Sequence, residues 1–443
     1  MEDDAALEAL PADAGILGIV VDRSALALAS AAAWWNGDPS CELLVIGVTG
    51  TNGKTTTSFL AAAGLAGAGI RTGLVGTIGA IVGGTLERNS LPQTTPSPVV
   101  LQTLLRRMRD AGDAAVVLET SSHGLAADRV ASIAYDAAIF TNLSHEHLDF
   151  HGTFAAYRAA KRSLFERLPA VAKDGRPGLE VIGIDDPAAP YFAEAARATG
   201  ARVIGYGEGA TADVRLLSID ASPTSLDVGY SIEGALRRLR LGMGGRVNAR
   251  NALAVMALAL GRGLPLDAVE AGLAALPGVP GRMEAVDLGQ PFRVIVDFAH
   301  TPGAFAALLA ELRAAMGGSG RILIVFGASG ERDTGKRPLM GRAAAEGADV
   351  VIVTQDDPRG EPLGPILDSI AAGAEAAGAL LGDRLRIVPD RGEAVATALG
   401  LARAGDVVLL AGKGHETWNL TAAGREPWDE RAVAEAALRR LGF

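Results

Sequence analysis

The sequence has little of what secreted, membrane-spanning and nucleic-acid-binding proteins depend on. Its 443 residues include 1 cysteine, Cys41, so no disulfide can form within the chain, which fits a reducing compartment. No uninterrupted apolar run approaches the ~18 residues of a membrane span, and the acidic start after Met1 does not match a signal peptide. The formal net charge of -10 argues against general binding to nucleic acids. We therefore expect a soluble, cytoplasmic protein that acts on small molecules, without a nucleic-acid or membrane partner.

Internal repeats and low-complexity linkers are also missing, and short apolar runs alternate with alanine-rich helical stretches. Such alternation is typical of α/β proteins with buried parallel strands. The first strands are expected at Leu43–Val48, Thr72–Val75, Ala115–Leu118, Ala137–Phe140 and Val181–Ile184. The helices expected with them include Lys54–Ala68 and Val247–Gly261. Residues 213–247 differ, because short strand-like pieces around Ser-Pro and Glu-Gly turns predict a small antiparallel sheet there.

A second α/β series follows Pro277–Arg282, a segment rich in proline and glycine that we interpret as a hinge. Its strands are expected at Phe292–Val296, Arg321–Phe326, Val350–Val353, Leu385–Val388 and Val407–Leu410, with helices at Thr301–Met316 and Arg337–Gly347. This order predicts a doubly wound, Rossmann-like domain. We expect a central domain with a parallel sheet at residues 43–280 and a C-terminal domain at 281–443, whereas residues 1–42 are too few for an independent domain.

The clearest chemical signal is the direct succession of an apolar strand, a glycine-containing loop and a helix start. This is the layout of a P-loop-type ATPase site, in which backbone N–H groups hold phosphate oxygens at the positive end of a helix. Lys54 can reach the β- and γ-phosphates, and the Thr55 hydroxyl can bind Mg²⁺. The usual pattern has a further glycine where this chain has Val48, so the loop is the shorter Gly50-Thr-Asn-Gly-Lys-Thr-Thr56. An ordinary strand-to-helix turn is the competing interpretation.

Acidic and imidazole side chains follow two other expected strands. Glu119 ends one of them, at the sheet edge where α/β proteins bind ligands, although a turn or capping role is common for such a residue. Three of the 6 histidines lie in the segment Thr141–Gly152, together with two acidic residues. A zinc site is an alternative here, but no cysteine is near and the H-E-x-x-H spacing is absent. Oxygen and imidazole ligands beside phosphates favour Mg²⁺ or Mn²⁺.

Motifs from residue 43 to the C-terminus resemble, in order, those of the Mur ligase family, in particular the members that add the third residue of the peptidoglycan stem peptide. In the first half they are Gly50–Thr56, Thr94–Pro98, Glu119–Leu125, Asn142–Gly152 and Tyr157–Phe165. In the second half they are Asn248–Asn251, Gly281–Glu284, Asp297–Pro302, Glu331–Pro338, Asp356–Arg359 and Gly412–Glu416. Folylpolyglutamate synthetases share the fold, but they resemble Gly-Lys-Gly-Ser where this chain has Gly53-Lys-Thr-Thr56.

The resemblance implies an ATP-dependent, amide-forming ligase that uses two Mg²⁺ ions. In such enzymes a substrate carboxylate attacks the γ-phosphate of ATP, and an incoming amine then displaces phosphate from the acyl phosphate. The first step brings anions together and therefore requires a dense positive charge. The implied acceptor is UDP-N-acetylmuramoyl-dipeptide, and the implied amino acid is meso-diaminopimelate or lysine.

The resemblance also implies roles for individual residues. The implied ATP-binding residues are Gly50, Thr51, Asn52, Gly53, Lys54, Thr55, Thr56, Asn251, Arg282 and Asp297. The implied metal ligands are Thr55 and Glu119 for one ion, and His147 and Lys161 for the other. Lys161 matches a lysine that the family carbamylates, and the implied catalytic residues are Lys54, Glu119, His147 and Lys161. Acceptor contacts are implied for Thr94, Thr95, Ser121 and Arg129, and amino-acid contacts for Arg332, Asp357, Arg359, Gly412 and Glu416.

The chain departs from the family pattern in three places. Only 42 residues precede Leu43, fewer than the family uses to bind the UDP portion of the acceptor, so this part is expected to be a remnant of that domain. The amino-acid-selecting motif reads Asp356-Asp-Pro-Arg359 where the diaminopimelate enzymes have Asp-Asn-Pro-Arg. Arg359 can pair with a distal carboxylate, whereas Asp357 adds an anion that favours an ammonium group. His145-Glu146 also replaces the usual Arg-Asp.

Two other function classes stay open at this point. A Mur-type ligase could use the same ATP chemistry on a carboxylate acceptor outside peptidoglycan, without a UDP group. A catalytically silent scaffold is the other class, although such a protein has no need for the catalytic and metal-binding set around Lys54. We expect a monomer in either case.

Overall fold

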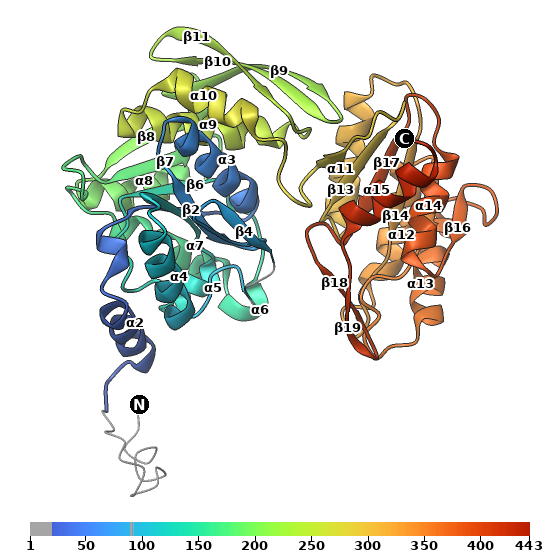
Figure 1. The fold of residues 1–443 in the computed structure, drawn as a ribbon, viewed down its shortest axis with the longest axis horizontal. Coiled ribbons are helices and arrows are strands. Elements are labelled where there is room, and N and C mark those ends of the chain that lie inside the picture. The colour runs from blue at the N-terminus through green and yellow to red at the C-terminus, as the bar shows by residue number, and fades with distance from the viewer. Residues whose placement is uncertain (1–19, 89–90, 92) are drawn as a thin grey trace, which may run out of the picture. The chain divides into compact units, whose positions relative to one another are not determined.

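The computed structural model describes residues 20–88, 91 and 93–443 (Figure 1). The chain forms two compact units. The first comprises Met1–Leu217, Tyr230–Arg237 and Arg250–Leu273, and the second comprises Ser218–Gly229, Arg238–Ala249 and Ala274–Phe443. Residues 1–19 of the expected N-terminal remnant lie outside the described part, which begins shortly before helix α2 (Ser24–Trp35).

The larger sheet has 11 strands in the order β11-β10-β9-β8-β7-β6-β1-β5-β2-β3-β4. Neighbours from β2 to β9 run parallel, and β3 and β4 form an antiparallel edge. The strands are β1 Leu44–Thr49, β2 Thr72–Gly76, β3 Gly79–Val82, β4 Thr85–Arg88, β5 Ala115–Glu119, β6 Ala137–Phe140, β7 Leu179–Gly183, β8 Arg202–Gly207, β9 Val214–Ser222, β10 Ser225–Ile232 and β11 Ala235–Leu241.

Helices cover both faces of this sheet. They are α3 Lys54–Gly67, α4 Pro98–Asp110, α5 Ser122–Ala126, α6 Leu148–His151, α7 Phe154–Arg162, α8 Ala189–Ala198, α9 Val247–Arg262 and α10 Leu266–Ala275, with 3-10 turns η1 Pro39–Cys41 and η2 Phe165–Arg167. Helices α4 and α8 pack on one face through a common apolar core. Helices α3 and α10 touch almost backbone to backbone, because a Cβ added at Gly67 would lie 2.3 Å from the Ala268 carbonyl oxygen.

The strands that the sequence predicts at β1, β2, β5, β6 and β7 are present. The strands expected in residues 213–247 are present as β9, β10 and β11, but they do not form a small sheet of their own. Tyr206 of β8 pairs in parallel with Val214 of β9, which joins them to the large sheet. Strands β3, β4 and β8 had no clear sequence signal. Two of them have 4 residues each, which is too short for an alternating pattern to stand out.

The second unit is built on a 6-stranded sheet in the order β12-β13-β17-β14-β15-β16. Its strands are β12 Glu284–Val286, β13 Arg293–Asp297, β14 Ile322–Phe326, β15 Val350–Val353, β16 Leu385–Ile387 and β17 Val407–Ala411. Its helices are α11 Pro302–Ala315, α12 Lys336–Gly347, α13 Leu363–Ala376, α14 Arg391–Leu401 and α15 Glu430–Arg440. A hairpin of β18 (Trp418–Thr421) and β19 (Gly424–Pro427) stands apart from the sheet.

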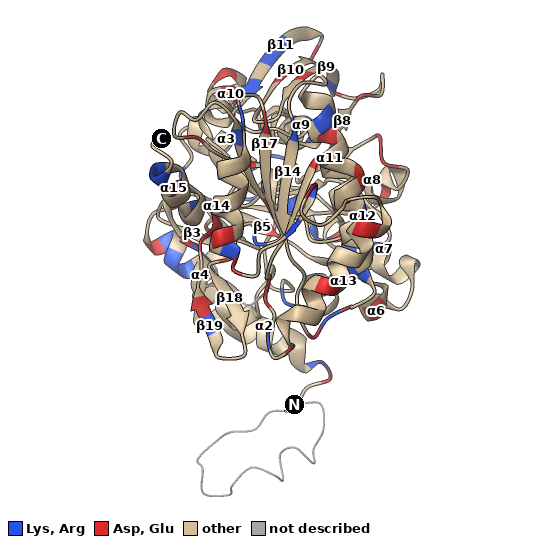
Figure 2. Ribbon diagram, turned by 90° about the vertical axis from the view of Figure 1, so that its right-hand side faces the viewer, with Lys and Arg blue, Asp and Glu red and all other residues tan. Residues whose placement is uncertain are grey.

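This second sheet is doubly wound, as the sequence predicts. Alternate residues of β14 enter two different cores, one shared with α11, α12 and α13 and the other with α14 and α15. Figure 2 shows that β14 and β17 carry no charged residue, whereas the surrounding helices carry both signs of charge. No helix in the described part of the chain is long and apolar enough to cross a membrane.

A fully buried ion pair joins α14 to α15. The Arg391 guanidinium donates to both carboxylate oxygens of Glu430 over 2.8 to 3.2 Å, and both side chains are 0% exposed. Burial opposes the charge on Arg391, but Glu430 outweighs it and raises the Arg391 pKa. We expect Arg391→Ala to lower the free energy of unfolding by roughly 3–5 kcal/mol, because it leaves a buried carboxylate without its partner. Urea unfolding followed by circular dichroism measures this loss.

The exposed pair of Arg439 and Glu435 on α15 provides the matched control. Arg439→Ala should change the free energy of unfolding by no more than about 0.5 kcal/mol. Arg391→Met combined with Glu430→Leu should recover part of the loss, since no charge then remains buried. Equal losses for Arg391→Ala and Arg439→Ala would contradict this account.

Glu180 on β7 is a buried carboxyl without a partner. The side chain is 0% exposed, and neither carboxyl oxygen has a hydrogen-bond partner in the described structure. Burial raises its pKa from 4.5 to about 8. The folded state therefore holds this proton more tightly than the unfolded state, and the free energy of unfolding falls as the pH rises from about 4.5 to about 8.

Glu180→Gln removes this titration while keeping the shape of the side chain. We expect the variant to be more stable than the wild type by about 2 kcal/mol or more at pH 8, and similar to it near pH 5. Thermal or urea unfolding at both pH values measures the difference. A stability difference that does not depend on pH would show that Glu180 is not protonated in the folded protein.

Candidate active site

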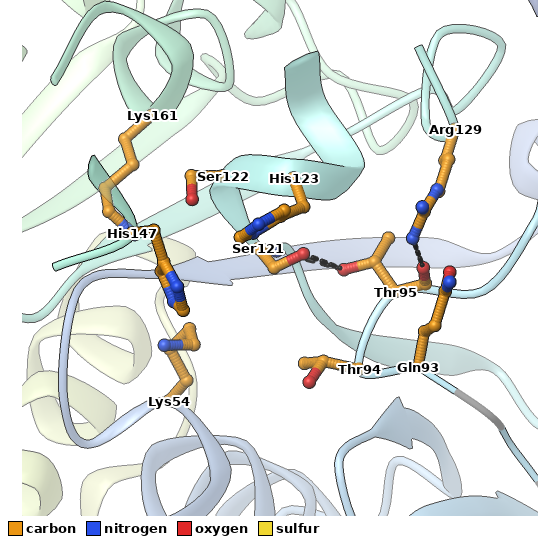
Figure 3. A pocket seen from close by; sticks show the side chains of 10 residues that line it. All are labelled: Lys54, Gln93, Thr94, Thr95, Ser121, Ser122, His123, Arg129, His147 and Lys161. Atoms are coloured by element: carbon orange, nitrogen blue, oxygen red, sulfur yellow. Dashed lines mark hydrogen bonds between the residues drawn. The ribbon is translucent and has the colours of Figure 1, made fainter. Parts of the chain in front are cut away.

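A pocket of about 310 Å³ opens in the first unit, beside the loops that follow β1, β5 and β6 (Figure 3). It is lined by Lys54, Gln93, Thr94, Thr95, Ser121, Ser122, His123, Arg129, His147 and Lys161. Seven of these are residues that the sequence analysis had singled out, and six of the seven come from five separate motifs. In Figure 3, Lys54, His147 and Lys161 gather at one end of the pocket, and Gln93, Thr95 and Arg129 lie at the other.

The loop between β1 and α3 has the tight form of a phosphate-binding loop. Gly50 and Gly53 both have positive φ angles, of 148° and 85°. A Cβ at Gly53 would lie 2.7 Å from Oδ1 of Asn251, which α9 places against the loop. The loop is tied to the segment after β6, because Thr51 N–H donates to the Asn142 carbonyl at 2.8 Å and Asn52 N–H to Asn142 Oδ1 at 3.0 Å. These contacts hold the loop backbone in place before any ligand binds.

Two lysine amino groups meet at this loop. Lys54 Nζ donates to the carbonyls of Gly50 (2.9 Å) and Thr51 (2.8 Å), and Lys161 Nζ donates to the same Gly50 carbonyl at 2.7 Å. Lys161 is 1% exposed and lies over the ring of Tyr157. Burial, followed by the charge of Lys54, holds the Lys161 pKa well below its usual value. Two amines this close favour an anion between them, such as a phosphate or a carboxylate.

Thr55 and Glu119 form an oxygen cluster next to the loop. The Thr55 hydroxyl donates to Glu119 Oε2 at 3.1 Å. Thr77 contributes its N–H and its hydroxyl to the same carboxylate, at 3.1 and 2.9 Å, a contact that the sequence analysis missed. Gly76 permits the approach, since a Cβ there would lie 2.1 Å from Glu119 Oε1. A hydroxyl beside a buried carboxylate matches the hard oxygen ligands that Mg²⁺ prefers, so these residues fit the implied ion.

Three histidines lie together at the edge of the pocket. His147 starts α6 in a left-handed conformation with a φ of 55°, and its ring centroid is 4.7 Å from that of His123. His151 lies 5.5 Å from His123. Burial, followed by the neighbouring imidazoles, lowers the pKa of His123, which favours a neutral ring. His123 follows β5 and had no separate signal in the sequence beyond its place in the Glu119 motif.

These histidines do not form a zinc site in this structure. In the described residues, the one group of three or more histidine, cysteine or acidic side chains whose ligand atoms lie within 4.8 Å of one another is Asp356, Asp357 and Glu416, in the second unit. His145 stacks on Phe154, with ring centroids 4.4 Å apart. The zinc alternative therefore has no geometric support.

The residues implied for the acceptor form a connected hydrogen-bond network. The Thr95 hydroxyl donates to the Glu119 carbonyl (2.8 Å) and contacts the Ser121 hydroxyl (3.0 Å), and Arg129 Nη1 donates to the Thr95 carbonyl at 2.9 Å. The Thr94 hydroxyl lies 3.1 Å from that of Thr77. Gln93 and Ser122 also line this pocket, although the sequence analysis did not select them. This end of the pocket offers hydroxyls and one guanidinium for a polar, anionic ligand.

Arg282 and Asp297 lie near each other in the second unit. Asp297 ends β13 and accepts the N–H groups of Met283 and Ala299, both at 2.8 Å. Burial raises the Asp297 pKa, against the effect of the nearby Arg282 charge. The Arg282 guanidinium lies over the ring of Phe298 at 4.8 Å. Asp297 thus organises the turn that holds Arg282 and Phe298.

The residues implied for the amino acid lie on loops after β14, β15 and β17. Because these strands are parallel neighbours, their carboxyl ends meet at one edge of the sheet. Gly330 N–H donates to the Asp357 carbonyl at 2.9 Å, and a Cβ at Gly412 would lie 2.5 Å from Asp356. Glu331, Asp357 and Arg359 have positive φ angles of 54°, 47° and 56°. Non-glycine residues with positive φ angles persist where surrounding contacts hold the backbone in a strained conformation, and such residues are common at binding sites.

Asp357 has an ammonium partner within the chain. We expected its anion to favour an ammonium group, and in the structure it forms an ion pair with Lys413, which is 0% exposed. Burial opposes the charge on Lys413, and Asp356, Glu416 and Asp357 outweigh it and raise its pKa. Burial, followed by the other carboxylates, raises the Glu416 pKa to about 7. Lys413 belongs to the motif Gly412–Glu416, but the sequence did not indicate which residues it contacts.

Two family models match this chain. Residues 48–259 match the Mur ligase middle domain, and residues 281–414 match the Mur ligase glutamate ligase domain. A UDP-N-acetylmuramyl-tripeptide synthetase of Roseiflexus sp. (strain RS-1) is 43% identical over 429 residues, which cover 96% of this chain and 84% of that protein. A UDP-N-acetylmuramoyl-L-alanyl-D-glutamate--2,6-diaminopimelate ligase of Pseudomonas aeruginosa is 40% identical, over 99% of this chain and 86% of that protein.

Solved structures agree with these matches. A structure titled UDP-N-acetylmuramoyl-L-alanyl-D-glutamate--2,6-diaminopimelate ligase superimposes with a TM-score of 0.70 at 30% identity, covering 97% of this chain and 85% of that one. A Mycobacterium tuberculosis folylpolyglutamate synthase complexed with ADP has a TM-score of 0.66 at 20% identity, which shows a common fold. The family resemblance of the sequence is thus confirmed. The chain belongs to the Mur ligase family, whose members are ATP-dependent, ADP-forming ligases.

Proposed function

We propose that this protein joins a diamino acid, 2,6-diaminopimelate ahead of lysine, to UDP-N-acetylmuramoyl-L-alanyl-D-glutamate at the expense of ATP, in peptidoglycan biosynthesis. The observation that carries the proposal is the pocket of the first unit. One end holds two lysines at a phosphate-binding loop, and the other holds the hydroxyls and guanidinium of the implied acceptor site. The names of the relatives supply the acceptor and the amino acid.

In this proposal the acceptor carboxylate attacks the γ-phosphate of ATP and forms an acyl phosphate, with ADP leaving. The amine of the diamino acid then attacks the acyl carbon, loses a proton and expels phosphate. Lys54 lies where negative charge collects in the first step, and together with the metal ions it would compensate charge that otherwise repels the attacking carboxylate. Arg129 and the hydroxyls of Thr94, Thr95 and Ser121 bind and orient the acceptor.

Two Mg²⁺ ions would neutralise phosphate charge during this transfer. Thr55 and Glu119 would hold one ion, and His147 and a carbamylated Lys161 would hold the other. The buried hydroxyl–carboxylate pair of Thr55 and Glu119 supports the first assignment. The second relies on the position of His147 and Lys161 in the same pocket.

The nucleotide contacts of the proposal come from several segments. Backbone N–H groups of Gly50 and Gly53 and the side chains of Thr55 and Thr56 would hold the phosphates. Thr51 and Asn52 would shape the loop around the nucleotide, since their N–H groups donate to Asn142. Asn251, buried against Gly53, would meet the adenine. Arg282 and Asp297 are proposed as further nucleotide-binding residues, on the basis of the family resemblance.

We also propose that the protein works as a monomer in the cytoplasm. Its parts would be an N-terminal remnant at residues 1–42, a central ATP-binding domain at 43–280 and a C-terminal amino-acid-binding domain at 281–443. The matched ranges of the two family models support the last two boundaries.

One assay tests the reaction directly. Release of phosphate from ATP is measured across a panel of amino acids, with and without UDP-N-acetylmuramoyl-L-alanyl-D-glutamate. We expect release only when the acceptor and a diamino acid are both present, together with a product of the combined mass. Turnover on a different carboxylate, without the UDP-linked acceptor, would replace this proposal with a Mur-type ligase outside peptidoglycan synthesis.

The choice of amino acid gives a sharper prediction. Arg359 forms no ion pair in the described structure, and its Nε is buried without a hydrogen-bond partner. A carboxylate at the far end of the amino acid would satisfy it. We expect Arg359→Ala to raise the KM for 2,6-diaminopimelate by about 10²-fold and that for lysine by less than about 3-fold, since only the former has a distal carboxylate. Equal changes in both KM values would show that Arg359 does not select the substrate.

A further inference from the structure

Lys413 lies at the centre of three carboxylates at the end of β17. Its Nζ is 3.4 Å from Asp356 Oδ1 and 3.4 Å from Glu416 Oε2, and it forms a closer ion pair with Asp357. It also donates to the Trp418 carbonyl at 3.1 Å. Oxygen atoms of the three acids lie close enough to share a metal ion, but the Lys413 ammonium contacts all three. The chain therefore supplies the cation of this cluster itself.

Asp357 is held in this position by the β18 strand as well as by Lys413. Leu420 N–H donates to Asp357 Oδ1 at 2.8 Å, and Asp357 N–H donates to Asn419 Oδ1 at 3.0 Å. Both Asp357 and Asn419 are buried, at 5% and 3% exposure. The carboxylate thus points into the protein, with its charge compensated there.

Arg359 has the opposite surroundings, although it lies two residues further along the same loop. Its N–H donates to the Leu420 carbonyl at 2.9 Å, which fixes the backbone on the same strand. Its side chain is half-buried and forms no ion pair in the described part of the chain. In this loop the Asp357 carboxylate is therefore buried and paired, whereas the Arg359 guanidinium has no anionic partner in the described part of the chain.

We propose that Lys413 is a positioning residue that sets amino-acid specificity by neutralising Asp357. The inference rests on the proposed function and extends it. A free carboxylate at position 357 would repel the distal carboxylate of 2,6-diaminopimelate and attract the distal ammonium of lysine. With Asp357 paired to Lys413, the negative charge at that position is compensated within the chain, and Arg359 decides the preference.

The first test is Asp357→Asn, which removes the anion but keeps the shape of the side chain. The ratio of kcat/KM for 2,6-diaminopimelate to that for lysine should change by less than about 3-fold, because the Asp357 carboxylate is buried and directed at Lys413, which keeps Asp356 and Glu416 as partners. A selective loss of lysine turnover by about 10-fold or more would overturn the inference, since it would show that Asp357 acts on the substrate.

The second test is Lys413→Met, which leaves Asp357 without its cation. The same ratio should fall by at least about 10-fold, and adding Asp357→Asn to Lys413→Met should restore it. Arg425→Met is the matched control. Arg425 is an exposed cation on the hairpin of β18 and β19, where it stacks on Trp418, and the kcat/KM ratio of the variant should match that of the wild type. An unchanged ratio in folded Lys413→Met would overturn the inference.

The two tests remain informative if Lys413→Met fails to fold. The Asp357→Asn variant keeps Lys413 and has no carboxylate at position 357, so a selective loss of lysine turnover in this variant alone would still overturn the inference. Failure of the proposed function is separate, because wild-type protein would then ligate neither amino acid to the UDP-linked acceptor. Turnover of both by the wild type, with ratios insensitive to Lys413, would reject this inference only.

Discussion

Lys54→Ala is expected to lower ATP-dependent phosphate release by roughly 10²–10³-fold or more, because it removes a preorganised cation from the site of phosphoryl transfer. In the structure, Lys54 Nζ bonds to the Gly50 and Thr51 carbonyls within the loop and lines the pocket. Neither contact joins distant parts of the fold, so the variant should keep its secondary structure and melting temperature. Steady-state phosphate release with both substrates measures the effect.

Arg202→Ala provides the control for this experiment, since Arg202 is an exposed cation at the start of β8, far along the sheet from the loop. Its activity should stay within about 2-fold of the wild type, as for a surface substitution away from the site. Phosphate release at the wild-type rate by a folded Lys54→Ala protein would end the phosphate-site assignment.

Lys161→Ala should also remove most of the activity, by about 10²-fold or more, if the carbamylated side chain is a ligand of the second ion. Carbamylation requires a neutral amine that can take up CO₂. Lys161 meets this condition, because it is 1% exposed, shares the Gly50 carbonyl with Lys54 and has a lowered pKa from burial and from that neighbour. The product carboxylate would also lie between cations, which stabilises it.

Chemical rescue and mass analysis separate this role from a structural one. Short carboxylic acids should partly restore the activity of Lys161→Ala, since they replace the missing carboxylate, whereas they should not restore Lys54→Ala. Depleting CO₂ and bicarbonate should lower wild-type activity, and returning bicarbonate should recover it. A fully active enzyme in which Lys161 is unmodified would refute the proposal.

Much of the fold is predictable because its signals are local. Each parallel strand is a short run of apolar residues buried on both faces, and the helix starting at Lys54 follows its glycine loop directly. The strand β9 is the exception, because alternating burial along Val214–Ser222 is compatible with a separate sheet or with an extension of the large one. Local pattern predicts a strand, whereas its neighbour is chosen by packing.

The sequence by itself determined the family, the two α/β series and the motif residues that line the pocket, because glycine, lysine and acidic residues at fixed spacings follow from the chemistry of phosphate binding. The tertiary structure decided which of these charges are available to a ligand. Thr77 meets Glu119, His123 meets His147, and Lys413 compensates Asp357, although each pair is separated widely along the chain. A charge acts according to its neighbours and its exposure to water, and these depend on how distant segments pack.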